Sequence, residues 1–500
     1  MASTPASLRA RRAAILVAGA VLLAGAACND LQKQQQRRET VLNRIGYGPD
    51  PWSRQRIAEL GVAAYIEEQL NPSALDDSAL EAQIASLYPV TTMAYGQSRT
   101  TFHEYTGNPE MGPFIPLRDG THAKILRAVK SKKQLEQVLV DFWYNHFNVD
   151  ALIEEARWGY LTMERDAIRP HVFGKFEDML RAVAQNPGML DYLDNSVNFK
   201  TDFVYLGTKR GINENYAREI LELHTVGVDG GYSQQDVREV ARAFSGWTVA
   251  VTTNSTSNGF MFYSPGHDRG AKSVMGLELP ANRGQMDGID VIRHLSLLPQ
   301  TAYFLSRKLC QRFISEPPPQ RVVDAAAQTY LATGGDLRET VRTILLSPEL
   351  TDPAYFRGKV KRPLVYVASL GRALGVNDDH WFAYVMATRV SQMGETLFRA
   401  GPPTGYPDVS RYWVGEGAYV ARINLAWEAA HGNLGFAPQF DAPGPTPAEV
   451  VNQLQKQFIK TGIRPETRAA LETLARGLPP GAVVPQTAAT LLASPENLVH

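Results

Sequence analysis

Apolar residues recur every three to four positions through most of the chain beyond residue 40, which is the spacing of helices with one buried face. Residues 122–149 contain two such helices in succession, and the second is apolar on nearly every side. Ser233 and Asp236 form a Ser-x-x-Asp capping box, which predicts the start of another helix. Further helices are predicted over 301–314, 320–332, 336–346, 359–374, 418–432, 447–460 and 466–476. We therefore predict a mainly α fold built around one large multi-helical domain.

Three interruptions of the helical period indicate other structure. Residues 259–276 hold two short aromatic or β-branched runs around Pro-Gly and Gly-Ala turns, which predicts a small β-hairpin inserted in the helical domain. Residues 401–408 (GPPTGYPD) are predicted to form a loop, because proline and glycine disfavour regular structure. The Pro-rich residues 436–449 are predicted to link a main domain over 29–435 to a C-terminal helical hairpin over 450–500 that packs on it.

One polar segment, NENYAREILELHTVGVDGGYS (213–233), carries several groups capable of chemistry. On a helix, one stripe of this segment comprises Asn215, Glu219 and Glu222. Arg218 lies beside the stripe, whereas His224 falls on the apolar side and is predicted to be a core histidine near the helix C-terminus. Metal ligands on one helix need a spacing of three or four residues, so Glu-x-x-Glu-x-His does not form a metal motif. The stripe is either a solvated helix face or part of a site.

A second polar stripe lies on the helix LVDFWYNHFNV (139–149), which is otherwise apolar. It comprises Asp141, Asn145 and Asn148, with His146 at its edge. Unsatisfied buried amides and carboxylates cost about 1–3 kcal/mol each, so these groups need partners. We expect the partners to be the Asn215, Glu219 and Glu222 face, joined by Arg218 or by Asp191, Asp194 and Asn195. Such a network is either structural or part of a functional site.

A third group lies in the turn of the expected hairpin, where His267 and Asp268 precede Lys272. A histidine and a carboxylate presented from a loop suit acid–base work or metal ligation. The dipeptide alone is a weak signal, and it gains weight from the two polar stripes described above. The sequence therefore indicates one site assembled from three segments.

Glu219 is predicted to be the functional carboxylate of this site, together with His267 and Asp268 as catalytic residues. It lies mid-stripe, with polar neighbours one helical turn away on both sides, and burial beside other carboxylates would raise its pKa toward that of a general acid. The residues predicted to bind or orient a ligand are Asn145, His146, Asp194, Asn215, Arg218, Glu222 and Lys272.

The first 28 residues read as an export signal, with a basic start, an apolar run too short for a membrane span and small residues before Cys28. Cys28 is predicted to be lipidated and to become the mature N-terminus, which tethers an envelope or periplasmic protein to the membrane only through its lipid. Ordinary secretory cleavage after Ala26 is the alternative. Cys310, the second of two cysteines, lies in an amphipathic helix and is predicted to be a small buried apolar residue.

Composition excludes several classes of function. The chain carries 51 basic and 51 acidic residues, so a nucleic-acid partner is not expected. The sequence lacks the signatures G-x-S-x-G, H-E-x-x-H and C-x-x-C, the P-loop and the Rossmann glycine pattern. No cofactor is indicated by these motifs.

Several segments resemble, in order, a bacterial family catalogued as domain of unknown function 1800. They are VLNRIGYGP (41–49), FWYNHFNV (142–149), the long motif over 213–249, HDRGAK (267–272), RKLCQRF (307–313), GKVKRPLVYV (358–367) and the terminal LLASPE. The chain departs from the family pattern at GYPD (405–408), where the family has a tryptophan after the glycine. The resemblance implies an exported bacterial protein, often encoded beside secreted proteins that resemble alkaline phosphatases and sulfatases, and it implies no particular reaction.

Three functions are compatible with these features. The first is a hydrolase of envelope or extracellular polymers, carbohydrate foremost, that uses a carboxylate and histidine cluster. The second is a non-catalytic envelope scaffold that binds a protein partner. The third is a metal-dependent enzyme, in which His146, His267 and nearby acids hold a divalent metal.

Overall fold

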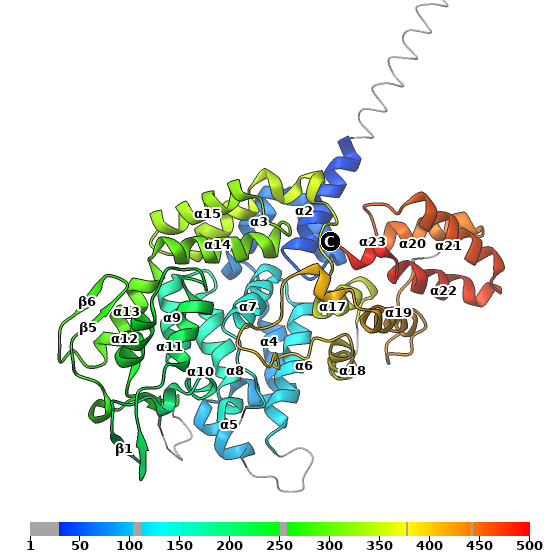
Figure 1. The fold of residues 1–500 in the computed structure, drawn as a ribbon. Helices are drawn as coiled ribbons and strands as arrows, with labels where there is room; N and C mark the ends of the chain where they lie inside the picture. Colours follow the sequence, from blue (N-terminus) through cyan, green and yellow to red (C-terminus); the bar gives the residue numbers. More distant parts are fainter. Residues whose placement is uncertain (1–29, 104–111, 154, 251–257, 377–378, 442–443) are drawn as a thin grey trace, which may run out of the picture.

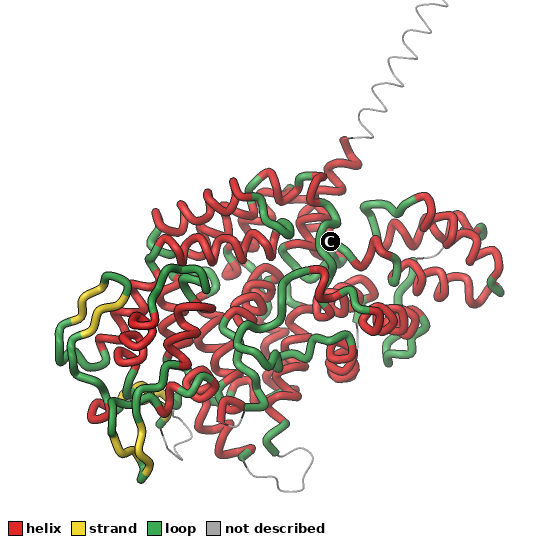
Figure 2. Tube along the Cα trace, in the orientation of Figure 1, coloured by secondary structure: helices red, strands yellow, loops and turns green. Residues whose placement is uncertain are grey.

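The protein is mainly helical, as predicted (Figures 1 and 2). The computed structural model describes residues 30–103, 112–153, 155–250, 258–376, 379–441 and 444–500. None of the helices in these ranges is both long and apolar enough to cross a membrane. Cys28 lies outside the described residues, as does the rest of the expected export signal.

The N-terminal helices surround one that is buried along nearly its whole length. A helix over 30–44 is followed by α2 (Pro51–Leu60), α3 (Val62–Leu70), α4 (Ser78–Leu87), α5 (Tyr95–Phe102), α6 (Ile115–Lys130) and α7 (Gln134–His146). In α7, Val138, Leu139 and Trp143 are fully buried. The predicted burial of this helix is confirmed.

The middle of the chain forms a second group of helices. These are α8 (Tyr160–Thr162), α9 (Phe176–Ala184), α10 (Pro187–Tyr192), α11 (Asn215–Glu219), α12 (Gln234–Phe244), α13 (Met286–Ser296), α14 (Pro299–Phe313), α15 (Gln320–Ala332) and α16 (Leu337–Leu345). The Ser233–Asp236 capping box that starts α12 is confirmed. Cys310 on α14 is buried and its sulfur is not in a disulfide, as expected.

The C-terminal helices return to the start of the chain. They are α17 (Pro363–Leu374), α18 (Asp379–Gln392), α19 (Glu416–Ala430), α20 (Pro447–Phe458), α21 (Pro465–Gly477), α22 (Pro480–Leu492) and α23 (Pro495–Leu498). Three substantial helices, rather than a two-helix hairpin, therefore follow the Pro-rich stretch, and α19 packs against α22. A single core cluster contains apolar side chains from Val41 to Leu498.

The strands are short, and they pair differently from the expectation. The described residues contain three two-stranded antiparallel sheets. β1 (Phe203–Tyr205) pairs with β2 (Thr208–Arg210), β3 (Trp247–Val249) with β4 (Phe260–Phe262), and β5 (Lys272–Val274) with β6 (Leu277–Leu279). The hairpin predicted within 259–276 is thus wrong in its pairing, because its two runs form strands in two different sheets.

Residues 359–361 were expected to begin a helix, and this is wrong. Val360 instead pairs with Val499, and backbone hydrogen bonds join Lys359 to His500 on one side of that pair and Lys361 to Leu498 on the other. Arg362 is extended and Pro363 opens α17, since proline suits the first turn of a helix and restricts the residue before it.

Candidate functional site

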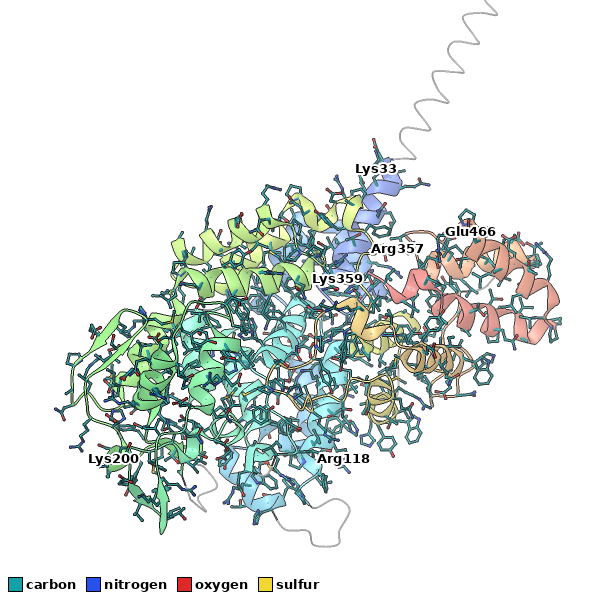
Figure 3. All side chains as sticks on the ribbon, viewed as in Figure 1. Lys33, Arg118, Lys200, Arg357, Lys359 and Glu466 are labelled. Carbon is teal, nitrogen blue, oxygen red and sulfur yellow. The ribbon has the colours of Figure 1, made fainter. Side chains whose placement is uncertain are left out.

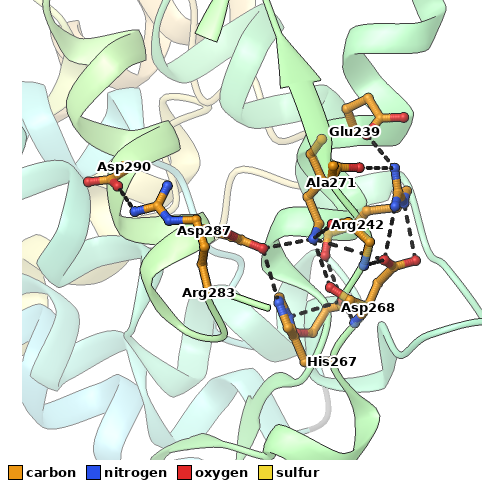
Figure 4. A network of polar contacts seen from close by, with 11 residues as sticks. Glu239, Arg242, His267, Asp268, Ala271, Arg283, Asp287 and Asp290 are labelled. Atoms are coloured by element: carbon orange, nitrogen blue, oxygen red, sulfur yellow. Dashed lines mark hydrogen bonds and ion pairs between the residues drawn. The ribbon is translucent and has the colours of Figure 1, made fainter. Parts of the chain in front are cut away.

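The predicted catalytic histidine, His267, lies in a closed polar network (Figure 4). Its Nδ1 lies 2.8 Å from the carbonyl oxygen of Ser245, and its Nε2 lies 3.2 Å from Oδ2 of Asp287. Lys272 Nζ donates to the same Asp287 oxygen at 2.7 Å and to the carbonyls of Asp268 and Gly270. Because His267 and Asp287 are fully buried and Lys272 nearly so, this network holds β5 against α13 rather than facing a ligand.

Asp268 turns away from His267 and pairs with an arginine of α12. Its two carboxylate oxygens accept from Nε and Nη2 of Arg242 at 3.1 and 3.0 Å. Arg242 also pairs with Glu239 at 2.5 Å. Bonding to Arg242 and to the Gly270 amide outweighs burial and lowers the pKa of Asp268. Asp268 is therefore charged, and its pairing with Arg242 holds the loop between β4 and β5 against α12.

The three stripe residues of α7 do not pair with the polar side chains of the 213–224 segment, so the expected partners are wrong. Asp141 lies 3.0 Å from Lys124 Nζ and 3.4 Å from Arg362. Asn145 exchanges two hydrogen bonds with the backbone of Tyr406, at 2.7 and 2.8 Å. Asn148 donates to the carbonyl oxygen of Ala400. Asn145 and Asn148 thus bind the distant segment over 400–406, whereas Asp141 pairs with basic side chains.

The 213–224 segment is helical but changes its winding halfway. α11 continues into a π-helical turn, η7 (Ile220–His224), so that the side chains after Glu219 are rotated away from α-helical positions. Arg218 lies 3.5 Å from both Glu214 and Glu222, and Asn215 donates to Asp194 at 3.0 Å. The predicted polar stripe therefore exists as a partly exposed surface cluster.

Glu219 is half-buried within that cluster. Burial raises the pKa of its carboxyl group, and the charge of Glu222 adds to the effect. Asp191 on α10, which sequence reasoning placed only among the supporting residues, behaves similarly, since burial raises its pKa to about 6. The raised pKa expected of Glu219 is present, although neither carboxyl group is brought to His267.

A different cluster joins three of the segments singled out in the sequence. His146 on α7 is buried, its Nε2 lies 3.1 Å from the backbone oxygen of His224, and its Nδ1 lies 2.8 Å from Nζ of Lys308 on α14. Since a carbonyl oxygen can only accept, Nε2 carries the proton and Nδ1 accepts from the lysine. The His146 ring thus fixes the position of the Lys308 amine.

The Lys308 amine has no carboxylate partner within 4.0 Å among the described residues. Burial lowers its pKa to about 8. Burial and the nearby Lys308 charge also lower the pKa of His224 to about 3 and hold that of His146 well below its usual range. Both histidines are therefore neutral. His224 is buried as expected, but its two ring nitrogens have no hydrogen-bond partner among the residues that the structure describes.

Lys308 lines a surface groove of about 520 Å³ between α14 and the glycine-rich loop after η7. The loop contributes Val226 to Gly230, and α14 contributes five further residues, Gln300, Tyr303, Phe304, Arg307 and Gln311. Gly227 has a φ of +85°, and a Cβ there would lie 3.0 Å from the Phe304 ring, so glycine lets the loop approach α14. Asp229 supplies the one carboxylate of this lining.

The third function considered from the sequence required a metal centre. His146 and His267 belong to separate networks in the structure. Across the described ranges, no group of three or more histidine, cysteine, aspartate or glutamate side chains is arranged to hold a metal ion.

Comparison with known proteins places the chain in one family. A family model described as "Protein of unknown function (DUF1800)" matches residues 40–499. No curated protein and no solved structure matches the chain. The match spans all of the segments that form the Lys308 groove.

Proposed function

The chain belongs to the DUF1800 family, which is described only as a family of proteins of unknown function, and we propose from the site itself that it is an exported hydrolase of envelope or extracellular polymers. The bonds it cleaves are esters or amides. The reacting bond lies in the groove between α14 and the loop over 226–230.

The observation that carries this proposal is the Lys308 amine. It is a cation without a carboxylate partner among the described residues, it is held by neutral His146, and it lines an open groove. Burying a cation without a nearby carboxylate lowers the stability of the folded protein. Ionisable groups with such perturbed surroundings are concentrated at functional sites.

The groove contains the groups that acyl hydrolysis needs. Water adds to the carbonyl carbon while Asp229 accepts its proton, and the oxygen of the carbonyl becomes an oxyanion. Protonated Lys308 stabilises that negative charge in a partly desolvated position. The bond to the leaving oxygen or nitrogen then breaks, and the leaving atom takes the proton from Asp229.

Glycosidic cleavage fits this groove less well. Its transition state resembles an oxocarbenium ion and carries positive charge, which a neighbouring ammonium group would destabilise. Asp229 is also the single carboxylate of the lining, whereas glycosidases use two. Carbohydrate polymers that carry ester or amide groups contain the bonds that this groove would hydrolyse. They also occur outside the cytoplasm, where the expected export signal would direct the protein.

The test is acyl release from acylated envelope polysaccharides and peptidoglycan by the purified protein. Lys308→Met should lower kcat by about a hundredfold or more, as the loss of an oxyanion-stabilising donor does. Lys209→Met, which removes an exposed lysine of the β1–β2 hairpin, should be fully active. Equal activity of Lys308→Met and the wild type would contradict the proposal.

Glu219→Gln belongs in the same assay, because Glu219 stays a candidate with its raised pKa. If Glu219→Gln abolishes hydrolysis and Lys308→Met does not, the chemistry belongs to the surface cluster of α11.

A non-catalytic envelope scaffold is the second candidate. It is favoured by the network of His267, Lys272 and Asp287. The three side chains are buried and bond to one another, which is typical of a structural network rather than of an active site. Binding of an acylated polymer in the groove, with no product formed by the wild type, would support this second function.

A further inference from the structure

A small cavity lies where the N-terminal helix meets the C-terminal helices, far along the chain from the Lys308 groove. It holds about 50 Å³ and is lined by residues of the helix over 30–44, of α17 and of the segments that flank α20 and α23. Arg357, which is also in its lining, lies between the N-terminal helix and the C-terminal helices in Figure 3. The cavity therefore joins segments from the two ends of the described chain.

The cavity contains a buried lysine that lacks a counter-ion. Lys361 is only 4% exposed. The nearest partner of its amine is the Ser369 hydroxyl at 3.5 Å, the limit of a hydrogen bond. Within the part of the chain that the structure describes, no carboxylate lies within 4.0 Å of this amine. A buried ammonium without partners is costly, so a missing ligand is the simplest account of it.

The two carboxylates of the cavity lining are already engaged by other groups. Glu39 pairs with Arg54 at 3.0 Å, and Glu496 pairs with Arg464 at 2.8 Å. Neither carboxylate lies within 4.0 Å of the Lys361 amine, although the charge of Glu39 partly offsets the lowering of the Lys361 pKa.

Two further cations of the lining increase the positive charge. Arg357 is partly buried and donates to Thr461 and to the carbonyl of Gly462, and Lys460 is exposed. Burial, and then the charge of Arg357, lowers the pKa of Lys361 to about 7. Burial also lowers the pKa of both Arg357 and Lys460. Three basic side chains therefore line the cavity, against two side-chain carboxylates that already pair with arginines.

We propose that this cavity binds a small oxyanion, a phosphate, a sulfate or a carboxylate, whose oxygens accept hydrogen bonds from the Lys361 amine, while Arg357 and Lys460 contribute further positive charge to the lining. A space of 50 Å³ holds several water-sized groups, which matches the few heavy atoms of such an anion. The bound anion would tie α17 to the helix over 30–44 and to α23. This site is separate from the groove proposed for hydrolysis, and neither proposal depends on the other.

The experiment is calorimetric titration of the purified protein at pH 6 with phosphate, sulfate and acetate, each at constant ionic strength set with chloride. We expect saturable binding of at least one of these anions, and a preference for phosphate and sulfate or for acetate identifies a tetrahedral or a planar ligand. Lys361→Met should weaken binding by about tenfold to a hundredfold, as expected for one charge-assisted contact. Lys361→Gln provides a second variant if the first does not fold.

Lys209→Met is the matched control, because it removes an exposed lysine that lines neither the cavity nor the groove. It should bind the anion as tightly as the wild type. Binding should also weaken as the pH rises through about 7, since Lys361 then loses its proton. Absence of saturable binding, or equal affinity in the Lys361 variants, would overturn the proposal. Loss of binding in Lys308→Met alone would overturn it as well and would assign the anion to the groove.

Discussion

Lys308→Met is expected to stabilise the folded protein at neutral pH while it abolishes activity. The pKa of the Lys308 amine is lowered from 10.5 to about 8 by burial. Because each pKa unit corresponds to about 1.4 kcal/mol, keeping this amine charged in the folded protein costs about 3 kcal/mol below pH 8. Methionine has a similar length and carries no charge, so it removes that cost.

Part of this gain is lost at His146. Nδ1 of that ring accepts the lysine hydrogen bond of 2.8 Å, and the variant leaves it buried without a donor, which costs about 1–3 kcal/mol. A net stabilisation of about 1 kcal/mol at pH 7 is therefore expected. Between pH 8 and 10.5 the unfolded chain binds a proton at this lysine that the folded protein has released, so wild-type stability rises with pH in that window.

The assay is urea unfolding of the wild type and Lys308→Met at pH 7 and pH 10. The difference between their free energies of unfolding should move by about 2 kcal/mol in favour of the wild type at the higher pH. Lys209→Met, an exposed control, should differ from the wild type by less than about 0.5 kcal/mol at both values. A difference that does not change with pH, or a variant destabilised at pH 7 by more than about 2 kcal/mol, would refute the reasoning.

Four further outcomes are expected, three from the structure and one from the sequence. Asp287→Ala removes the carboxylate 2.7 Å from buried Lys272 and leaves only that of Asp268 at 3.9 Å, so it should destabilise the protein by about 3–5 kcal/mol in thermal or urea unfolding; a cost below about 1 kcal/mol would show that the network is dispensable. Gly405→Ala places a Cβ 2.3 Å from the Asn145 carbonyl oxygen at a φ of +67°, so it should destabilise by about 2 kcal/mol or more, and an unchanged unfolding midpoint would contradict the close packing of this loop. Glu219→Gln should keep both the fold and hydrolysis, because the carboxyl lies outside the groove lining; loss of turnover in a folded variant would return Glu219 to the site. Cys28→Ala should release the protein from membrane fractions or leave its precursor uncleaved, and unchanged processing and membrane association would exclude lipidation there.

The helices were largely predictable from the sequence, because burial of one face imposes a period on local residues. α15 occupies the predicted range of 320–332, and the capping box before α12 lies where Ser233 and Asp236 place it. The error at 359–361 arose because those residues pair with the end of the chain, which no local period reports. β4 likewise pairs with β3, a three-residue strand too short to show alternation.

The candidate site was less accessible to sequence reasoning. His146 was recognised on its buried helix, but its partner Lys308 is 162 positions away and looks like an ordinary polar residue of an amphipathic helix. The one available signal was the family resemblance, which includes both RKLCQRF (307–313) and the long motif over 213–249. Asp287 was missed for the same reason, since a single aspartate early in a helix indicates only a favourable helix end.

The pH dependence of kcat/KM for acyl release tests the central claim about Lys308 most directly. Hydrolysis requires the protonated amine, so kcat/KM of the wild type should fall above about pH 8 as one group titrates. Lys308→Arg keeps its charge at alkaline pH and should move this decline to a higher pH. An alkaline limb that is identical in the wild type and Lys308→Arg would contradict the account.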